Sequence, residues 1–338
     1  MKKRNVIVLL LCLLGMGANA QKVLVNSVTE EPIAGALVLN EDGRLLGVTK
    51  ADGTLSDEMT AAGKIDVVHF AYAPVEFQLN GTGAERLAMT PNVNRTAVTG
   101  TDKRGAKYVW IRGWQRNYQF ENKRLTFITE GIVEYLISLD GKKMMGYRTE
   151  GMQGLMAKGM SPDYDVTRIQ LSSYRPFIVK NKRVVAQNGN AGTWQLMKDG
   201  KPFGTQRDRI AENYCVVEIP DMIVDDPYKF NFLGAKFKFE YISIGQILTP
   251  YRADAKYTMA DLSVSHAFYS VDTRSSKKDT HYDYVEDFYA VEAELLTERE
   301  TMAALKRGDS PESVPLPANV PALSKALEKA KAGFVVSE

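Results

Sequence analysis

Short apolar runs that alternate with turn residues recur along most of the chain, and this pattern constrains the fold more than any other feature. Asp-Gly pairs at 42–43 and 52–53 separate some of the early runs, which lie at 22–28, 36–39, 45–49, 64–70, 75–79 and 86–89. Runs of this length are typical of strands, and Asp-Gly is typical of tight hairpins because glycine adopts positive φ without steric cost. We predict a mainly β protein that begins with a small β-sandwich at residues 21–90.

The second part of the chain predicts a larger antiparallel β-rich domain over residues 107–308, after a polar linker at 91–106. Two stretches alternate with period two. Tyr228, Phe230 and Phe232 share one face, and Phe237, Phe239 and Tyr241 share another. Such alternation indicates a sheet with one apolar face. Strands do not alternate with helices, which argues against a doubly wound nucleotide-binding fold.

The C-terminal part predicts short helices and an extended connection. Thr297 and Glu300 have the spacing of a capping box, so a helix is expected over 298–306. Residues 309–338 begin with four prolines between 311 and 321, which favour an extended strap, and a second short helix is expected over 324–331.

The first twenty residues have the features of a secretory signal peptide. Lys2, Lys3 and Arg4 precede a short apolar run, and Ala18 and Ala20 are the small residues that a signal peptidase requires. Cleavage is expected before Gln21. The apolar run is too short to span a bilayer comfortably, and no later stretch approaches the ~20 apolar residues of a transmembrane helix. We therefore expect an exported protein with no transmembrane helix after cleavage.

A family resemblance supports the sandwich. The stretch 29–38 (TEEPIAGALV) resembles the opening of the carboxypeptidase-regulatory-like domain, which has a transthyretin-like fold, and 49–55 (TKADGTL) is similar to its next motif. In 67–72 (VVHFAY) Ala71 stands where that family has glycine. The resemblance covers residues 22–90. It implies an accessory module of secreted and outer-membrane proteins, with no catalytic residues to carry over.

Charge and motifs exclude several function classes. The chain has a formal net charge of +2, which falls to about −1 without the three basic residues of the leader, so no nucleic-acid partner is expected. Phosphate-binding glycine loops, a nucleophile elbow and helical metal-ligand spacings are absent. We therefore expect no cofactor and no metal. Cys215 lies in an apolar run and is expected to be a buried strand residue.

Candidate site residues are few. The aromatic faces of Phe230, Phe232, Phe237 and Phe239 could line an apolar cavity, although sheet cores commonly contain such residues. His266 and His281 could meet across strands with Asp279 or Asp283 around a metal, which we consider the less favoured interpretation. No catalytic residue is assigned.

The sequence favours a non-enzymatic protein of the cell envelope, in the periplasm or at the outer membrane of a Gram-negative bacterium. In this hypothesis the sandwich positions the larger domain, which binds an envelope protein or a small ligand. Two alternatives stay open. One is an envelope hydrolase acting on peptide or glycan, with His266 or His281 in its site. The other is a periplasmic carrier of an apolar ligand.

Overall fold

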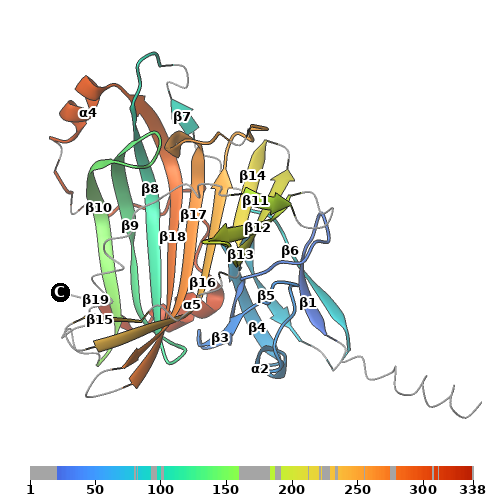
Figure 1. Cartoon of the computed structure of the whole chain (residues 1–338). Coiled ribbons are helices and arrows are strands. Elements are labelled where there is room, and N and C mark those ends of the chain that lie inside the picture. Colours follow the sequence, from blue (N-terminus) through green and yellow to red (C-terminus); the bar gives the residue numbers. More distant parts are fainter. Residues whose placement is uncertain are drawn as a thin grey trace, which may run out of the picture.

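The structure is a computed structural model of the chain, shown in Figure 1. It describes residues 21–79, 81, 83–92, 97–99, 103–159, 183–186, 192–211, 213–220, 222, 229–232, 235–254, 256–274, 279–306, 308–310 and 312–336. The expected signal peptide at 1–20 lies outside these residues. Among the described residues, no helix has the length and apolar character needed to cross a membrane.

Two small sheets form the N-terminal region, which we define as residues 22–92. One is antiparallel, with the order β3-β2-β4-β5, and in the other β1 pairs in parallel with β6. Gly43 and Gly53 of the two Asp-Gly turns have φ of 75° and 76°, as the sequence predicts. The elements are β1 (Lys22–Asn26), β2 (Leu37–Leu39), β3 (Leu45–Val48), α2 (Asp57–Ala61), β4 (Lys64–His69), β5 (Tyr72–Gln78) and β6 (Glu85–Met89).

The rest of the chain builds one large sheet, which is antiparallel except where β7 pairs with β18. Its main order is β11-β12-β13-β14-β16-β17-β18-β8-β9-β10-β19, with β15 on β16. A short helix, η1 (Met259–Asp261), precedes β17. The strands are β7 (Ala97–Thr99), β8 (Tyr108–Glu121), β9 (Arg124–Ser138), β10 (Met144–Ala157), β11 (Arg183–Ala186), β12 (Thr193–Lys198), β13 (Lys201–Ala211), β14 (Tyr214–Ile219), β15 (Lys229–Phe232), β16 (Ala235–Leu248), β17 (Leu262–Arg274), β18 (Asp279–Leu296) and β19 (Phe334–Val336).

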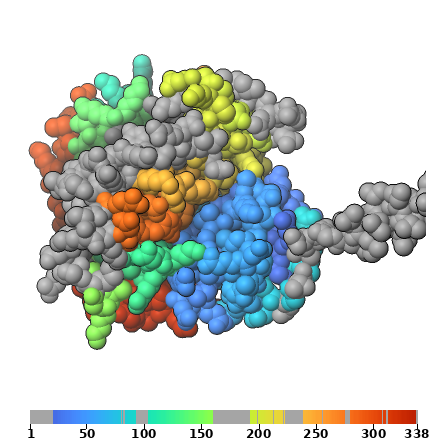
Figure 2. Space-filling view, turned by 60° about the horizontal axis from the view of Figure 1, so that its bottom comes forward, coloured from blue at the N-terminus to red at the C-terminus, as the bar shows by residue number. Residues whose placement is uncertain are grey.

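The N-terminal region packs against one face of the large sheet, which we call the covered face. Phe70 and Leu24 of the N-terminal region belong to the same buried apolar cluster as Trp114, Val264 and Tyr289 of the large sheet. In the space-filling view the blue N-terminal residues lie directly against orange and green residues of the sheet (Figure 2). The two parts therefore share a core.

The C-terminal residues run back across the covered face. α4 (Glu298–Ala304) lies at the upper end of the sheet in Figure 1, and α5 (Lys325–Lys331) lies near its lower part. Between them runs an extended segment, residues 312–323, which we call the strap. Leu327 of α5 packs with Leu39 of the N-terminal region and Tyr118 of β8, so α5 fills the angle between the two.

The predicted fold class is confirmed: the protein is mainly β, with a large antiparallel sheet and short C-terminal helices. The capping box is also confirmed, because Thr297 N–H donates to Glu300 Oε2 at 2.9 Å. Within the predicted linker, residues 97–99 form β7. Within β9, Gly131 allows the backbone of Met152 to approach closely, because an added Cβ atom would lie 2.6 Å from Met152 Cα.

The prediction that Phe237, Phe239 and Tyr241 share one face of the sheet is wrong. A register shift between Phe239 and Tyr241 makes Glu240 an extra residue of β16. Such a bulge reverses the alternation of side chains. Phe239 consequently packs with Val271, whereas Tyr241 packs on the covered face with Phe268.

Candidate functional site

A single row of mostly charged residues crosses the covered face. The strand registers place seven residues opposite one another in succession, and side chains directly opposite in antiparallel strands project from the same face. Apolar residues flank the row on both sides, with Val264 and Tyr289 on one side and Phe268 and Val285 on the other. The members of this polar row are Glu218 (β14), Gly245 (β16), His266 (β17), Asp287 (β18), Arg116 (β8), Glu130 (β9) and Gln153 (β10).

The middle of the polar row is sealed by the N-terminal region. His266 Nδ1 lies 2.7 Å from Asp287 Oδ1, and both residues are buried. The ring of Phe70 stacks on the His266 imidazole with 5.0 Å between centroids. It occupies the space above Gly245, where a Cβ atom would lie 2.2 Å from the Phe70 ring. Solvent therefore does not reach this His–Asp pair from the N-terminal side.

The β14 end of the row is joined to the N-terminal region by buried charges. Arg209 of β13 forms an ion pair with Glu218 and donates to Tyr72 Oη at 3.0 Å. His69 Nε2 lies 3.6 Å from Glu218 Oε1. Burial, followed by the nearby charge of Arg209, holds the pKa of His69 well below its usual range, and burial raises the pKa of Tyr72 to about 12. These groups hold the two parts in a fixed orientation.

The β10 end of the row contains a second buried ion network. Arg116 Nε donates to Glu130 Oε2 at 3.2 Å, and Arg116 Nη1 donates to the carbonyl of Pro321 at 2.8 Å. Lys331 of α5 also forms an ion pair with Glu130. Burial opposes the charge of Arg116, but attraction to neighbouring phenols and acids outweighs it and raises the arginine pKa. One carboxylate thus holds two cations between the sheet, the strap and α5.

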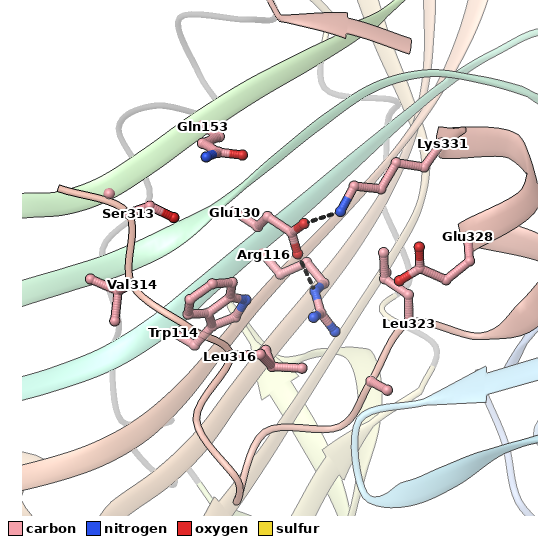
Figure 3. A pocket seen from close by; sticks show the side chains of 12 residues that line it. Trp114, Arg116, Glu130, Gln153, Ser313, Val314, Leu316, Leu323, Glu328 and Lys331 are labelled. Atoms are coloured by element: carbon pink, nitrogen blue, oxygen red, sulfur yellow. Dashed lines mark hydrogen bonds and ion pairs between the residues drawn. The ribbon is translucent and has the colours of Figure 1, made fainter. Parts of the chain in front are cut away.

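A pocket of about 260 Å³ opens beside this network (Figure 3). Arg116, Glu130 and Trp114 line its sheet side, and the strap lies across it. Glu328 and Lys331 of α5 border it on the remaining side (Figure 3). The full lining consists of Trp114, Arg116, Glu130, Gly151, Gln153, Ser313, Val314, Leu316, Ala322, Leu323, Glu328 and Lys331.

Fixed contacts at both ends hold the strap in place. Before it, Ser310 N–H donates to the carbonyl of Thr149, and Gly151 N–H donates to the carbonyl of Ser310, both at 3.0 Å. After it, Ser324 caps α5, and the buried Asp66 of β4 accepts from Ala326 N–H at 2.7 Å. The strap is therefore fixed by hydrogen bonds at both ends and passes over the polar side chains of Arg116 and Glu130.

Trp114 is the most informative residue of the pocket. Its side chain is buried, with 6% exposure, and its indole N–H has no hydrogen-bond partner among the residues that the structure describes. Figure 3 shows the indole nitrogen on the side of the ring that faces Arg116. A buried donor without an acceptor lowers the stability of the folded state by about 1–3 kcal/mol, and an acceptor on a bound ligand would remove this penalty.

A second, smaller pocket gives a useful contrast. It measures about 30 Å³ and lies between β8, β9, β10 and α4. Its tryptophan, Trp110, donates to Glu134 Oε2 at 2.9 Å, and Glu134 also pairs with Arg148. The donor is satisfied there, and little space is left for a ligand.

The structure separates the residues that the sequence grouped as a metal site. His266 lies opposite Asp287, and His281 lies opposite Asp272, six positions further along β17. This spacing corresponds to about 20 Å along the strand, so the two histidines do not meet. His281 does contact Asp283, at 3.2 Å from its Nε2, whereas Asp279 pairs with Arg274.

The aromatic residues predicted to line a cavity lie on β15 and β16. Phe230 pairs in register with Phe237, and Phe232 is the last residue of β15, opposite Ala235. Phe239 is half-buried and meets Tyr269 edge to face, at 6.4 Å between centroids. The structure does not describe the side chains of Phe230, Phe232 and Phe237, so an apolar cavity at this hairpin stays a prediction.

The sequence interpretation missed Trp114, Arg116 and Glu130. A signal for the first two is present in the stretch 110–118, where Trp, Arg, Trp, Arg and Tyr occupy every second position. A strand face that alternates arginines with large aromatic residues places charges among groups that are commonly buried, and buried charges need partners. Their partners come from other strands, and only the register reveals them.

Searches against models of protein families, curated proteins and solved structures find no match to this chain.

Proposed function

We propose that this protein is an exported, non-enzymatic binding protein of the bacterial envelope, and that its ligand occupies the pocket beneath the strap. The observation that carries the proposal is the unpartnered indole N–H of Trp114 at the wall of that pocket. Small-ligand sites typically combine an apolar wall with a few convergent polar groups. This pocket has both, because Val314 and Leu316 adjoin Trp114, Arg116 and Lys331.

The lining groups favour a small molecule that carries a carboxylate. The Trp114 N–H and the ammonium group of Lys331 are donors that a carboxylate can accept from. Glu328, which is exposed at the rim, can pair with an amino group on the same molecule. A volume of about 260 Å³ suits a ligand of the size of a free amino acid.

Export rests on the leader at residues 1–20, and the accessory role of the N-terminal region rests on its resemblance to carboxypeptidase-regulatory-like domains. Fractionation of cells that express the full precursor, followed by N-terminal sequencing, tests the first point. The expected result is a mature chain beginning at Gln21 in the periplasmic or membrane fraction. An unprocessed chain in the cytosol would contradict export and leave the pocket to be tested separately.

Thermal-shift titration of the mature protein with the twenty free amino acids and with small dicarboxylates tests the pocket. At least one compound should raise the melting temperature of the wild type and of Trp110→Phe, but not of Trp114→Phe. Trp110→Phe is the matched control, since Trp110 already donates to Glu134. Failure of every compound, or equal binding by Trp114→Phe, would refute the proposed ligand class.

A further inference from the structure

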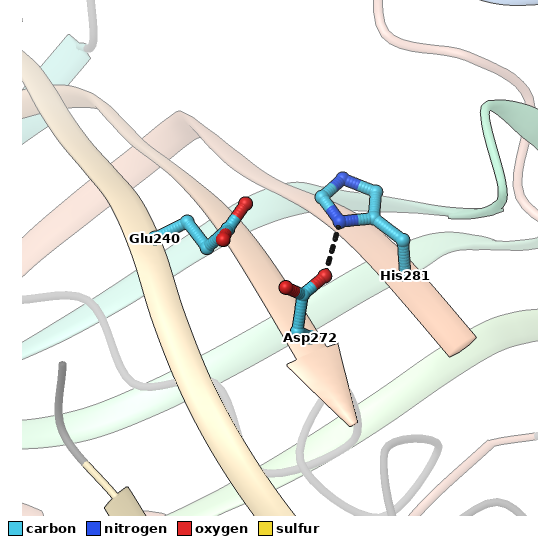
Figure 4. Close-up of side chains that lie close together, drawn as sticks. All are labelled: Glu240, Asp272 and His281. Atoms are coloured by element: carbon cyan, nitrogen blue, oxygen red, sulfur yellow. Dashed lines mark hydrogen bonds and ion pairs between the residues drawn. The ribbon is translucent and has the colours of Figure 1, made fainter. Parts of the chain in front are cut away.

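Away from the strap pocket, two acidic residues and a histidine converge from three adjacent strands. Glu240 lies on β16, Asp272 on β17 and His281 on β18, and one potential ligand atom of each lies within 4.8 Å of the other two. Figure 4 shows the Glu240 and Asp272 carboxylates close to the imidazole. His281 Nδ1 is 2.8 Å from Asp272 Oδ1.

The backbone explains how three side chains come together here. Asp272 and His281 are direct cross-strand partners in the β17–β18 register. Glu240 is the extra residue of the β16 bulge, between Phe239 and Tyr241. Bulges commonly redirect a side chain at a functional site. Lys238 lies directly opposite Asp272 in the register, and its ammonium group pairs with Glu240 at 2.8 Å, where a metal ion would replace it.

The second ring nitrogen of His281, Nε2, has polar partners of the kind that orient metal-binding histidines. His281 Nε2 lies 3.2 Å from Asp283 Oδ1 and 3.2 Å from Ser270 Oγ. Asp283 is buried, at 4% exposure. A histidine that binds a metal usually has its second nitrogen bound to a carboxylate, which fixes the ring. Asp283 fulfils that role here and leaves Nδ1 directed at Asp272.

We propose that Glu240, Asp272 and His281 form a site for a divalent transition-metal ion, with zinc as the best match, and that Asp283 positions the His281 ring. One nitrogen and two carboxylate ligands suit zinc, which accepts mixed N and O ligands and can hold water at a fourth position. The Glu240, Asp272 and His281 side chains are 30–45% exposed, so an ion and its water can enter from solvent.

Titration of the tag-free mature protein with Zn²⁺ in a calorimeter tests the proposal. The wild type should bind one Zn²⁺ saturably, and Asp272→Asn and Glu240→Gln should each weaken binding by at least about tenfold. Asp279→Asn is the matched control, because Asp279 is an exposed carboxylate of the same hairpin that pairs with Arg274 outside the cluster. Its affinity should match that of the wild type.

The absorption of Co²⁺ added in place of Zn²⁺ gives a second readout, because visible bands report the ligands of the ion. Adventitious binding to the other two histidines is not expected, since His69 and His266 are both buried at 4% exposure. The proposal is overturned if the wild type shows no saturable Zn²⁺ binding. It is equally overturned if Asp279→Asn loses as much affinity as Asp272→Asn, with circular dichroism confirming that all variants are folded.

Discussion

At the scale of single residues, the protein keeps ionisable groups on both faces of its large sheet, and their environments differ. On the covered face, Arg116 and Glu218 have partners of opposite charge within the polar row or beside it. On the other face, Glu286 of β18 is buried at 7% exposure and lies opposite Ala267 and Asn117. Burial, then repulsion from Asp287, raises its pKa to about 8.

This raised pKa predicts a pH-dependent loss of stability. Between about 4.5 and 8 the folded protein keeps the Glu286 proton while the unfolded chain releases it, so the free energy of unfolding falls as the pH rises through this window. The neighbouring titratable groups, Asp287, Tyr135 and Tyr269, do not supply a cation. Glu286→Gln should therefore stabilise the protein at pH 9, by up to about 5 kcal/mol, and change little at pH 4.

Urea unfolding of the wild type and Glu286→Gln at several pH values measures this difference. Glu294→Gln, an exposed position of the same strand, is the control and should give a constant offset. If the difference between Glu286→Gln and wild type did not grow with pH, Glu286 would not be a buried acid in solution.

At the scale of elements, the sequence predicts where chain segments are extended and where helices begin, because those depend on local pattern. Asp-Gly turns, the Thr297 capping box and buried Cys215 are all visible in the sequence and are confirmed. What it does not reveal is register. The polar row needs strands far apart in sequence, such as β8 and β18, to align. The Glu240 bulge and the pairing of Arg116 with Glu130 join consecutive strands, but they too depend on an alignment that the local pattern does not set.

The strap and α5 provide an element-scale prediction. Ser324 caps a helix of only seven residues, accepting from Leu327 N–H, so its loss should cost about 1 kcal/mol. Ser324→Ala should speed amide hydrogen exchange in residues 325–331 and weaken ligand binding in the strap pocket, since Lys331 and Glu328 sit on this helix. Ser313→Ala, at an exposed strap position, should leave exchange in α5 unchanged. Equal exchange in both variants would show that α5 is held without its cap.

At the scale of the whole molecule, the N-terminal region is part of the core of the large sheet. Leu24, Ile33 and Phe70 share one buried cluster with Val264 and Tyr289. Arg209 of the large sheet also donates to Tyr72 Oη of the N-terminal region at 3.0 Å, a partly buried hydrogen bond that would be lost if the parts moved. Separation would expose all of these groups, so the two parts should unfold in one cooperative transition.

Gly245→Ala tests this coupling, because the new Cβ would lie 2.2 Å from the Phe70 ring and force it off His266. Overpacking of this kind costs about 1–3 kcal/mol.

Urea unfolding can be followed with two probes. Tryptophan fluorescence reports the large sheet, because the three tryptophans lie on β8 and β12. Hydrogen exchange in residues 64–78 reports the N-terminal region. In the wild type the two midpoints should coincide. In Gly245→Ala exchange in 64–78 should begin at lower urea, while Gly83→Ala, in open space, should behave as wild type. Distinct midpoints in the wild type would mean that the N-terminal region unfolds as an independent domain despite its shared core. The polar row would then lie at an interface between two separable domains.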